Sequence, residues 1–367
     1  MTTERPTPPS RRGLLKYLGL FAGAAALPAA LRTFATQRPS PLSPNPSISP
    51  AISISELAVP TPLAAAGSNP HRVILVRTTD RAAGVRRAIE LLQPSSFRNQ
   101  QVFIKPNYNT GDPAPASTDP VVLETLVQEI QGAGARSITV GDRSGMAETR
   151  KAMEQQQVFA LAQRYGFDTV VFDELGRYDW QYFAAAGTNW SRGFAVARPV
   201  LDADAIVNVC CLKTHRFGGH FTLSLKNTVG MVARHVPGDG HNYMRELHRS
   251  ANQRLMIAEV NKVYRPSLII IDGVDAFVNG GPEQGQRIQA GVILASTDRI
   301  AIDAVGIALL RKLGTTREVA SGSIWSQAQI RRAADLGLGA INAEQIDLVT
   351  ADGASAQMAD EVRQFLS

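Results

Sequence analysis

Cysteine is nearly absent from this chain, which has two among its 367 residues. The two are neighbours, Cys210 and Cys211, in an apolar run that predicts a strand. Adjacent cysteines can bridge only through a small strained ring, so we expect no structural disulfide. Two thiolates are also too few for an ordinary four-cysteine iron–sulfur cluster within one chain. Both cysteines are therefore interpreted as small apolar core residues.

An excess of basic charge is lacking once residues 1–35 are set aside. The formal net charge is +6, and four of these charges come from Arg5, Arg11, Arg12, Lys16 and Arg32 against Glu4. The remaining +2 gives no basic field of the kind that binds nucleic acid. Nucleic acid is therefore excluded as a predicted partner.

No apolar run is long enough to predict a permanent transmembrane helix. Residues 17–31 are the nearest approach, but they are rich in Ala and Gly and contain Pro28, whereas a span needs about 20 apolar residues. They follow Ser10-Arg11-Arg12-Gly13-Leu14-Leu15-Lys16, the pattern of a twin-arginine export signal, and precede a candidate cleavage site at Thr33-Phe34-Ala35. Residues 1–35 are thus a predicted signal peptide that directs the protein to the periplasm or cell surface. Membrane contact is expected only if this signal stays uncleaved.

Residues 36–70 are rich in Pro, Ser, Ala and Thr and have almost no charge. Such a segment cannot bury a core and is predicted to be a disordered, semi-extended linker. The folded part is then residues 71–367, enough for one large α/β domain or for two intimately packed lobes.

Strand and helix patterns alternate along this folded part. Helices are predicted at 82–92, 119–131, 245–263 and 299–313, and strands at 72–76, 101–105, 137–140, 169–172, 205–209, 268–271 and 291–295. The alternation predicts an α/β fold in which helices sandwich a mostly parallel sheet.

Polar residues follow several of these strands at the point where each strand ends. They are Lys105 and Asn107, Asp142, Lys213 and His215, Asp272, and Asp298. In open α/β sheets the ligand site lies outside the carboxyl ends of the strands, so we expect these groups to line one crevice. For each aspartate the alternative is a helix cap or a turn.

Five of the six histidines lie in the short stretch from His215 to His248. His215 and His220 flank Gly218-Gly219 and are candidate metal ligands or a general acid–base pair. Lys226-Asn227 lies in an apolar run without a neighbouring acid, where an ammonium group needs an anion. The alternative is that the histidines are core, capping or solvent-exposed residues.

Several ordered segments resemble the domain of unknown function 362 family. They are Phe103-Ile104-Lys105-Pro106-Asn107, Thr118-Asp119-Pro120, Gly141-Asp142, 208–215, 222–230, Ile271-Asp272-Gly273, Gly281-Pro282, and 295–298 with 301–304. The resemblance spans residues 73–313. The activity of the family is unsettled, and many members carry cysteine clusters that link them to iron–sulfur chemistry. This chain has no such clusters.

One segment also resembles nickel-pincer lactate racemases. In those enzymes a histidine precedes a glycine-rich stretch and a lysine that tethers the cofactor; here His215, Gly218-Gly219 and Lys226 follow in that order. The resemblance implies a nickel-type cofactor as one candidate beside a simple divalent metal.

The sequence therefore predicts an exported, metal- or cofactor-dependent enzyme of unknown substrate, with a small anionic molecule as a candidate partner. We expect His215, His220, Lys226 and Asp142 in catalytic roles and Lys105, Asn107, Lys213, Asn227 and Asp272 in cofactor binding, with His215 and His220 as metal ligands. The alternative is a non-catalytic metal- or solute-binding protein tethered at the cell surface.

Overall fold

A computed structural model describes residues 51–63 and 69–366 of the chain. The predicted signal peptide, residues 1–35, lies outside the described residues. Part of the predicted linker does not: Ile54 is 2% exposed, and Ile52 pairs with the backbone of Tyr182 and Ala184. This segment packs against the domain, so the prediction of a disordered linker is wrong around Ile52 and Ile54.

A mixed sheet organises the described residues. Nine strands join in the order β11-β1-β10-β9-β7-β2-β3-β4, with β8 paired to β7. Their bounds are β1 (Arg72–Arg77), β2 (Gln101–Lys105), β3 (Ser137–Asp142), β4 (Asp168–Val171), β7 (Ala205–His215), β8 (His220–Thr222), β9 (Leu268–Gly280), β10 (Gly285–Ser296) and β11 (Asp347–Thr350). A separate hairpin joins β5 (Trp180–Phe183) to β6 (Phe194–Ala197).

Most neighbouring strands are parallel, which confirms the α/β prediction. The ladders β9-β7, β7-β2, β2-β3, β3-β4 and β1-β11 are parallel. Strand β10 runs antiparallel to both of its neighbours, β1 and β9, because a tight turn at 280–285 folds it back on β9. The carboxyl end of β10 therefore lies at the opposite edge from the ends of β2, β3 and β7.

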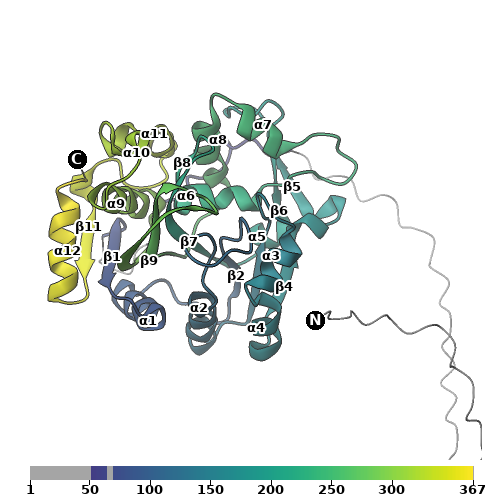
Figure 1. The fold of residues 1–367 in the computed structure, drawn as a ribbon. Helices are drawn as coiled ribbons and strands as arrows, with labels where there is room; N and C mark the ends of the chain where they lie inside the picture. Colours follow the sequence, from purple (N-terminus) through teal and green to yellow (C-terminus); the bar gives the residue numbers. More distant parts are fainter. Residues whose placement is uncertain (1–50, 64–68, 367) are drawn as a thin grey trace, which may run out of the picture. The chain divides into compact units, whose positions relative to one another are not determined.

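Alternation along the strands divides the apolar residues between the faces of the sheet. In β1, Val73 and Leu75 pack into one core, and Ile74 and Val76 pack into another. Most of the helical residues in the first core come from α9. Those in the second core come largely from α1 and α2, which lie next to each other in Figure 1. A third, aromatic-rich core lies under β5 and β6. All eleven residues of β7 are buried, as expected for a strand covered on both faces.

The helices cover both faces of the sheet. They are α1 (Arg81–Leu92), α2 (Pro120–Gly132), α3 (Thr149–Gln155), α4 (Val158–Tyr165), α5 (Arg198–Leu201), α6 (Ser224–Asn227), α7 (Tyr243–Arg249), α8 (Gln253–Val260), α9 (Arg299–Lys312), α10 (Arg317–Ala320), α11 (Ala328–Asp335) and α12 (Gly353–Arg363). The single helix predicted at 245–263 is two helices, because Ser250 adopts an extended backbone (ψ 134°) and ends α7. Within residues 51–63 and 69–366, no helix is both long and apolar enough to span a bilayer.

Candidate functional site

A cavity of about 80 Å³ lies where β2, β3 and β7 end, and α6, α7, β8 and adjoining loops complete its wall. We call it the strand-end cavity. Seven of the nine predicted site residues line it: Lys105, Asn107, Asp142, Lys213, His215, Lys226 and Asn227. They meet because parallel neighbours end at the same edge of a sheet, which is the usual position of ligand sites in α/β folds.

A buried ion pair forms the floor of the strand-end cavity. Lys105 Nζ lies 2.7 Å from Asp142 Oδ1, and both side chains are at most 2% exposed. Asp142 also accepts hydrogen bonds from the backbone N–H groups of Tyr108 (2.7 Å) and Arg143 (2.6 Å). Burial lowers the pKa of Lys105 and raises that of Asp142, while the opposite charge of each partner counteracts the shift of the other. The only carboxylate among the lining residues is therefore already paired.

An asparagine network holds a second lysine. Asn227 Nδ2 donates to Asn208 Oδ1 (2.7 Å) and to the Val209 carbonyl, and Asn227 Oδ1 accepts from Asn107 (2.8 Å). Asn107 Oδ1 in turn accepts from Lys213 Nζ at 2.7 Å, and the Ala116 carbonyl also accepts from this ammonium group. Both acceptors of Lys213 are neutral, and its burial lowers its pKa. Lys213 thus brings a basic group that no described carboxylate contacts.

Arg143 also lines the strand-end cavity and was not among the predicted site residues. Its guanidinium donates to the carbonyls of Ser144, Val229 and Val232, each at 2.8 Å, and Met244 Sδ lies 3.0 Å away. Burial lowers the pKa of Arg143 to about 10, so the group stays charged at neutral pH. Its position directly after Asp142, at the end of a predicted strand, was the sequence signal that could have identified it as a site residue.

His215 is a neutral histidine at the wall of the cavity. Its Nδ1 accepts a hydrogen bond from the backbone N–H of Phe217 (3.3 Å), which assigns the ring proton to Nε2. Nε2 has no hydrogen-bond partner among the described residues. Burial, followed by the charges of Lys226 and Lys213, lowers the pKa of His215 well below its usual range. His215 can therefore donate one hydrogen bond from Nε2.

Lys226 has no hydrogen bond or ion pair within the described part of the chain. Burial, followed by the charges of Lys213 and Arg143, lowers the pKa of Lys226 to about 7. Lys226 lies in α6, and the buried Asp303 of α9 anchors that helix by accepting hydrogen bonds from the backbone N–H groups of Ser224 (2.7 Å) and Leu225 (3.0 Å). The backbone of the helix that carries Lys226 is thus held in place, while its amine has no partner among the described residues.

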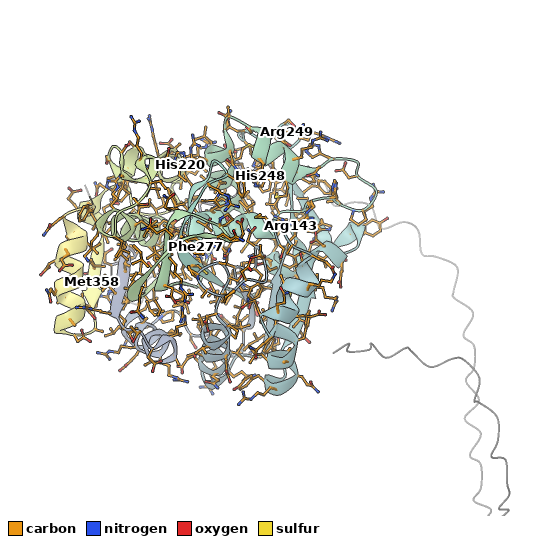
Figure 2. All side chains as sticks on the ribbon, viewed as in Figure 1. Arg143, His220, His248, Arg249, Phe277 and Met358 are labelled. Carbon is orange, nitrogen blue, oxygen red and sulfur yellow. The ribbon has the colours of Figure 1, made fainter. Side chains whose placement is uncertain are left out.

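Three further polar groups of the cavity wall were not predicted. Asn109 Nδ2 and Thr222 Oγ1 are buried and have no partner among the described residues. His248 of α7 donates from Nδ1 to the Met244 carbonyl (2.7 Å), so in the neutral ring Nε2 is an acceptor. Figure 2 labels Arg143 and His248 among the other side chains. Single polar residues in loops and short helices leave no distinctive sequence pattern.

Three residues expected in the crevice lie elsewhere. His220 pairs with His215 in the β7-β8 ladder, but it does not line the cavity and its backbone is left-handed (φ 62°). Asp272 sits in the middle of β9, 2.7 Å from Arg81 Nε. Asp298 caps α9 and lies 2.5 Å from His71 Nδ1. The one-crevice prediction is wrong for Asp298 because β10 is antiparallel, and wrong for Asp272 because β9 continues eight residues beyond it.

The lining does not suit a bare divalent cation. In the described residues, no three His, Cys, Asp or Glu side chains gather closely enough to hold a metal ion. Within the strand-end cavity, His215 and His248 are accompanied by one carboxylate, which Lys105 occupies. Arg143 stays charged at neutral pH and would oppose a metal ion there, as would Lys213 and Lys226 in their protonated forms.

The chain is similar to known proteins in sequence and, more weakly, in structure. It is 29% identical over 208 residues to the thylakoid-associated protein sll1697 of Synechocystis sp.; the match covers 56% of this chain and 61% of that protein. A solved structure, the lactate racemase apoprotein of Thermoanaerobacterium thermosaccharolyticum, matches with a TM-score of 0.36 and 16% identity. That match covers 56% of this chain and 50% of that one.

The family model for the domain of unknown function DUF362 matches residues 102–308. This region includes every residue that lines the strand-end cavity, from Lys105 to Pro282. The match extends over more than half of the chain, and the protein belongs to the DUF362 family.

Proposed function

We propose that the strand-end cavity binds a small anion and that Lys226 and His215 move protons on it. One observation carries the proposal. Basic side chains, together with hydrogen-bond donors that have no acceptor, line a cavity whose single carboxylate is already paired. A buried cation without a counterion is costly, and an anionic ligand removes that cost.

Each unpaired group suits an oxygen-rich anion. Lys213 and Arg143 contribute positive charge while bonding only neutral acceptors and a thioether sulfur. Asn109 Nδ2 can donate a hydrogen bond, as can His215 Nε2. Carboxylate and phosphate oxygens accept several such bonds at once, and charge-assisted bonds are the stronger ones. The site therefore favours a carboxylate or a phosphate.

Lys226 makes proton transfer feasible at neutral pH. With a pKa of about 7 it exists as both amine and ammonium under these conditions, which is the range in which a general base or acid works best. His215 stays neutral and supplies a hydrogen bond to a developing negative charge. Together they support an enzyme acting on an organic anion.

A cofactor is compatible with this proposal if it brings its own anionic groups. Lys213, Arg143 and Lys226 would hold those groups, and a metal would then arrive within the cofactor. In such a complex the cations of the wall bind and orient the cofactor and do not coordinate the metal.

Titration calorimetry with inorganic phosphate and with acetate tests the proposal. We expect binding, weakened on the order of 10–100-fold in Lys213→Met and in Lys226→Met, because each removes a charge-assisted contact. The matched control is Lys151→Met, since Lys151 is 70% exposed and paired with Glu148. Unchanged affinity in both cavity variants would contradict the proposal.

Turnover separates an enzyme from a solute-binding protein. Conversion of a 2-hydroxy acid or of a phosphorylated compound, lost in Lys226→Met, supports the enzyme. Tight binding without turnover supports the binder instead.

We also propose export through the twin-arginine route, on the strength of Arg11 and Arg12 before an apolar stretch. Replacing both by Lys should retain the protein in the cytoplasm, because the pathway reads the guanidinium pair. Cell fractionation measures this, and unchanged export of the double variant would remove the assignment.

A further inference from the structure

Two large apolar side chains stand exposed at the mouth of the strand-end cavity. Phe217 is 44% exposed and Met146 is 50% exposed, and both line the cavity. They come from separate segments, the β7-β8 turn and the loop after β3. Pro282 and the nearly buried Val229 and Met244 continue the apolar surface inward. The polar interior therefore opens onto an apolar rim.

The aromatic ring of this rim is held in place. The Arg216 guanidinium lies 4.4 Å from the Phe217 ring centroid, and Arg216 is itself fixed by Glu283 and by the Gly281 carbonyl. The His215 ring meets Phe217 edge-on, with 5.8 Å between ring centroids. An exposed aromatic ring that its neighbours already orient loses little freedom when a ligand covers it. Met146 adds a flexible apolar surface that adapts to different shapes.

The size of the cavity decides which part of a ligand can enter. At about 80 Å³ it accommodates a small head group, whereas pockets that enclose drug-sized molecules measure about 300–1,000 Å³. Any larger ligand must place the rest of its body at the mouth, against Phe217 and Met146.

We infer that the ligand of this protein is an anion with an apolar body, such as an alkyl or aryl carboxylate or phosphate ester. The anionic head lies among Lys213, Lys226 and Arg143, and the apolar body covers Phe217 and Met146. This inference rests on the proposed anion binding and adds the substrate class.

A homologous series of acids on the full chain tests the inference. Acetate, butanoate and hexanoate share one head group and differ only in methylene groups. We expect each added methylene to tighten binding about two- to fourfold. All three acids should be displaced by phosphate, which shows that they occupy the cavity.

Variants of the rim separate the body from the head group. In Phe217→Ala/Met146→Ala the gain from acetate to hexanoate should largely vanish, while acetate affinity stays within about twofold. Lys226→Met should weaken all three acids by a similar factor. Ile341→Ala is the control, because Ile341 is 56% exposed and lies outside the cavity. Melting temperatures check that each variant is folded.

Several results would overturn the inference. If acetate and phosphate bind but chain length has no effect, or the double rim variant keeps the full gain, the apolar-body inference fails and anion binding stands. If neither phosphate nor any acid binds, both fail. A flat series together with a dimer that the double variant abolishes, seen by sedimentation, would instead assign the rim to a contact between two copies of the chain.

Discussion

Two polar clusters lie on this sheet, and they differ in how their charges are paired. The Arg81 cluster comprises Arg81, Asp119, Asp272, Asp275 and Arg287. Arg81 Nε lies 2.7 Å from Asp272 and 3.6 Å from Asp119, and Arg81 contacts Asp275 at 2.9 Å, as does Arg287. Burial lowers the pKa of Arg81, but these carboxylates outweigh burial and raise the pKa above its usual range. Each of the two guanidinium groups has an anionic partner.

The strand-end cavity has the reverse balance. The side-chain basic groups of Lys213, Lys226 and Arg143 contact no carboxylate in the described residues, and burial lowers the pKa of each. A cluster in which every charge has a partner, such as that of Arg81, stabilises the fold. Unpaired cations reduce stability, and they are retained where a ligand supplies the missing negative charge. Unpaired charge therefore distinguishes the candidate site from a structural ion-pair network.

The largest expected effect on stability comes from breaking the Lys105–Asp142 ion pair inside the cavity. Asp142→Asn leaves the Lys105 ammonium buried without a counterion. We expect a loss of about 3–5 kcal/mol in the free energy of unfolding, measured by urea denaturation. The double variant Asp142→Asn/Lys105→Met should recover part of it, since no orphan charge remains. A loss below about 1 kcal/mol in the single variant would show that the pair is not buried as described.

The matching change in the Arg81 cluster should cost less. Asp272→Asn leaves Arg81 with Asp275 and Asp119, so we expect a loss of about 1–3 kcal/mol in the same assay. Phosphate affinity should stay within about twofold, because Asp272 does not line the cavity. Abolished anion binding in a folded Asp272→Asn protein would remove the distinction between the two clusters.

The pH dependence of stability reports on Lys226. The unfolded chain keeps this ammonium protonated to about pH 10.4, whereas the folded protein releases the proton near pH 7. Between these values the unfolded state binds more protons, so wild-type stability rises with pH. Lys226→Met lacks this dependence. It should therefore be the more stable protein at pH 7, with a difference that shrinks by about 2 kcal/mol by pH 9.

Sulfate, which does not titrate in this range, provides an independent check on the same group. Its affinity for the wild type should fall as the pH rises through about 7 and Lys226 loses its charge. Lys226→Met should show a flat profile. Parallel profiles in the two proteins would assign the titration to another group.

Much of the cavity could be predicted because it follows from strand ends. Lys105, Asp142 and His215 each terminate an apolar strand, and parallel strands end at a common edge. The same rule failed for Asp298, since it requires the direction of the strand. The β9-β10 turn was hidden because the outer part of β10 is polar and exposed, as at Gln286 and Arg287. Only short apolar segments of the two strands were recognisable.

Pairing of charges could not be predicted from the sequence. Lys105 and Lys226 look alike in the chain, each preceded by apolar residues, yet one contacts Asp142 and the other has no described partner. Arg143 was overlooked because two of its three carbonyl acceptors belong to residues more than 80 positions away. Long-range packing decides which cations remain free, and no local pattern records it.

The smallest expected effect on stability comes from Gly219, which lies against both Lys226 and His215. A Cβ at this position would approach Lys226 Cε to 2.5 Å and His215 Nδ1 to 3.2 Å. Because the lysine end is flexible, Gly219→Ala should displace it at a cost of about 1 kcal/mol or less, while phosphate affinity falls severalfold. Gly240→Ala is the control, since a Cβ there meets nothing within 4 Å. Affinity unchanged in Gly219→Ala would mean that the position of Lys226 does not matter to the bound anion, and the contrast between the two clusters would then rest on Lys213 and Arg143 alone.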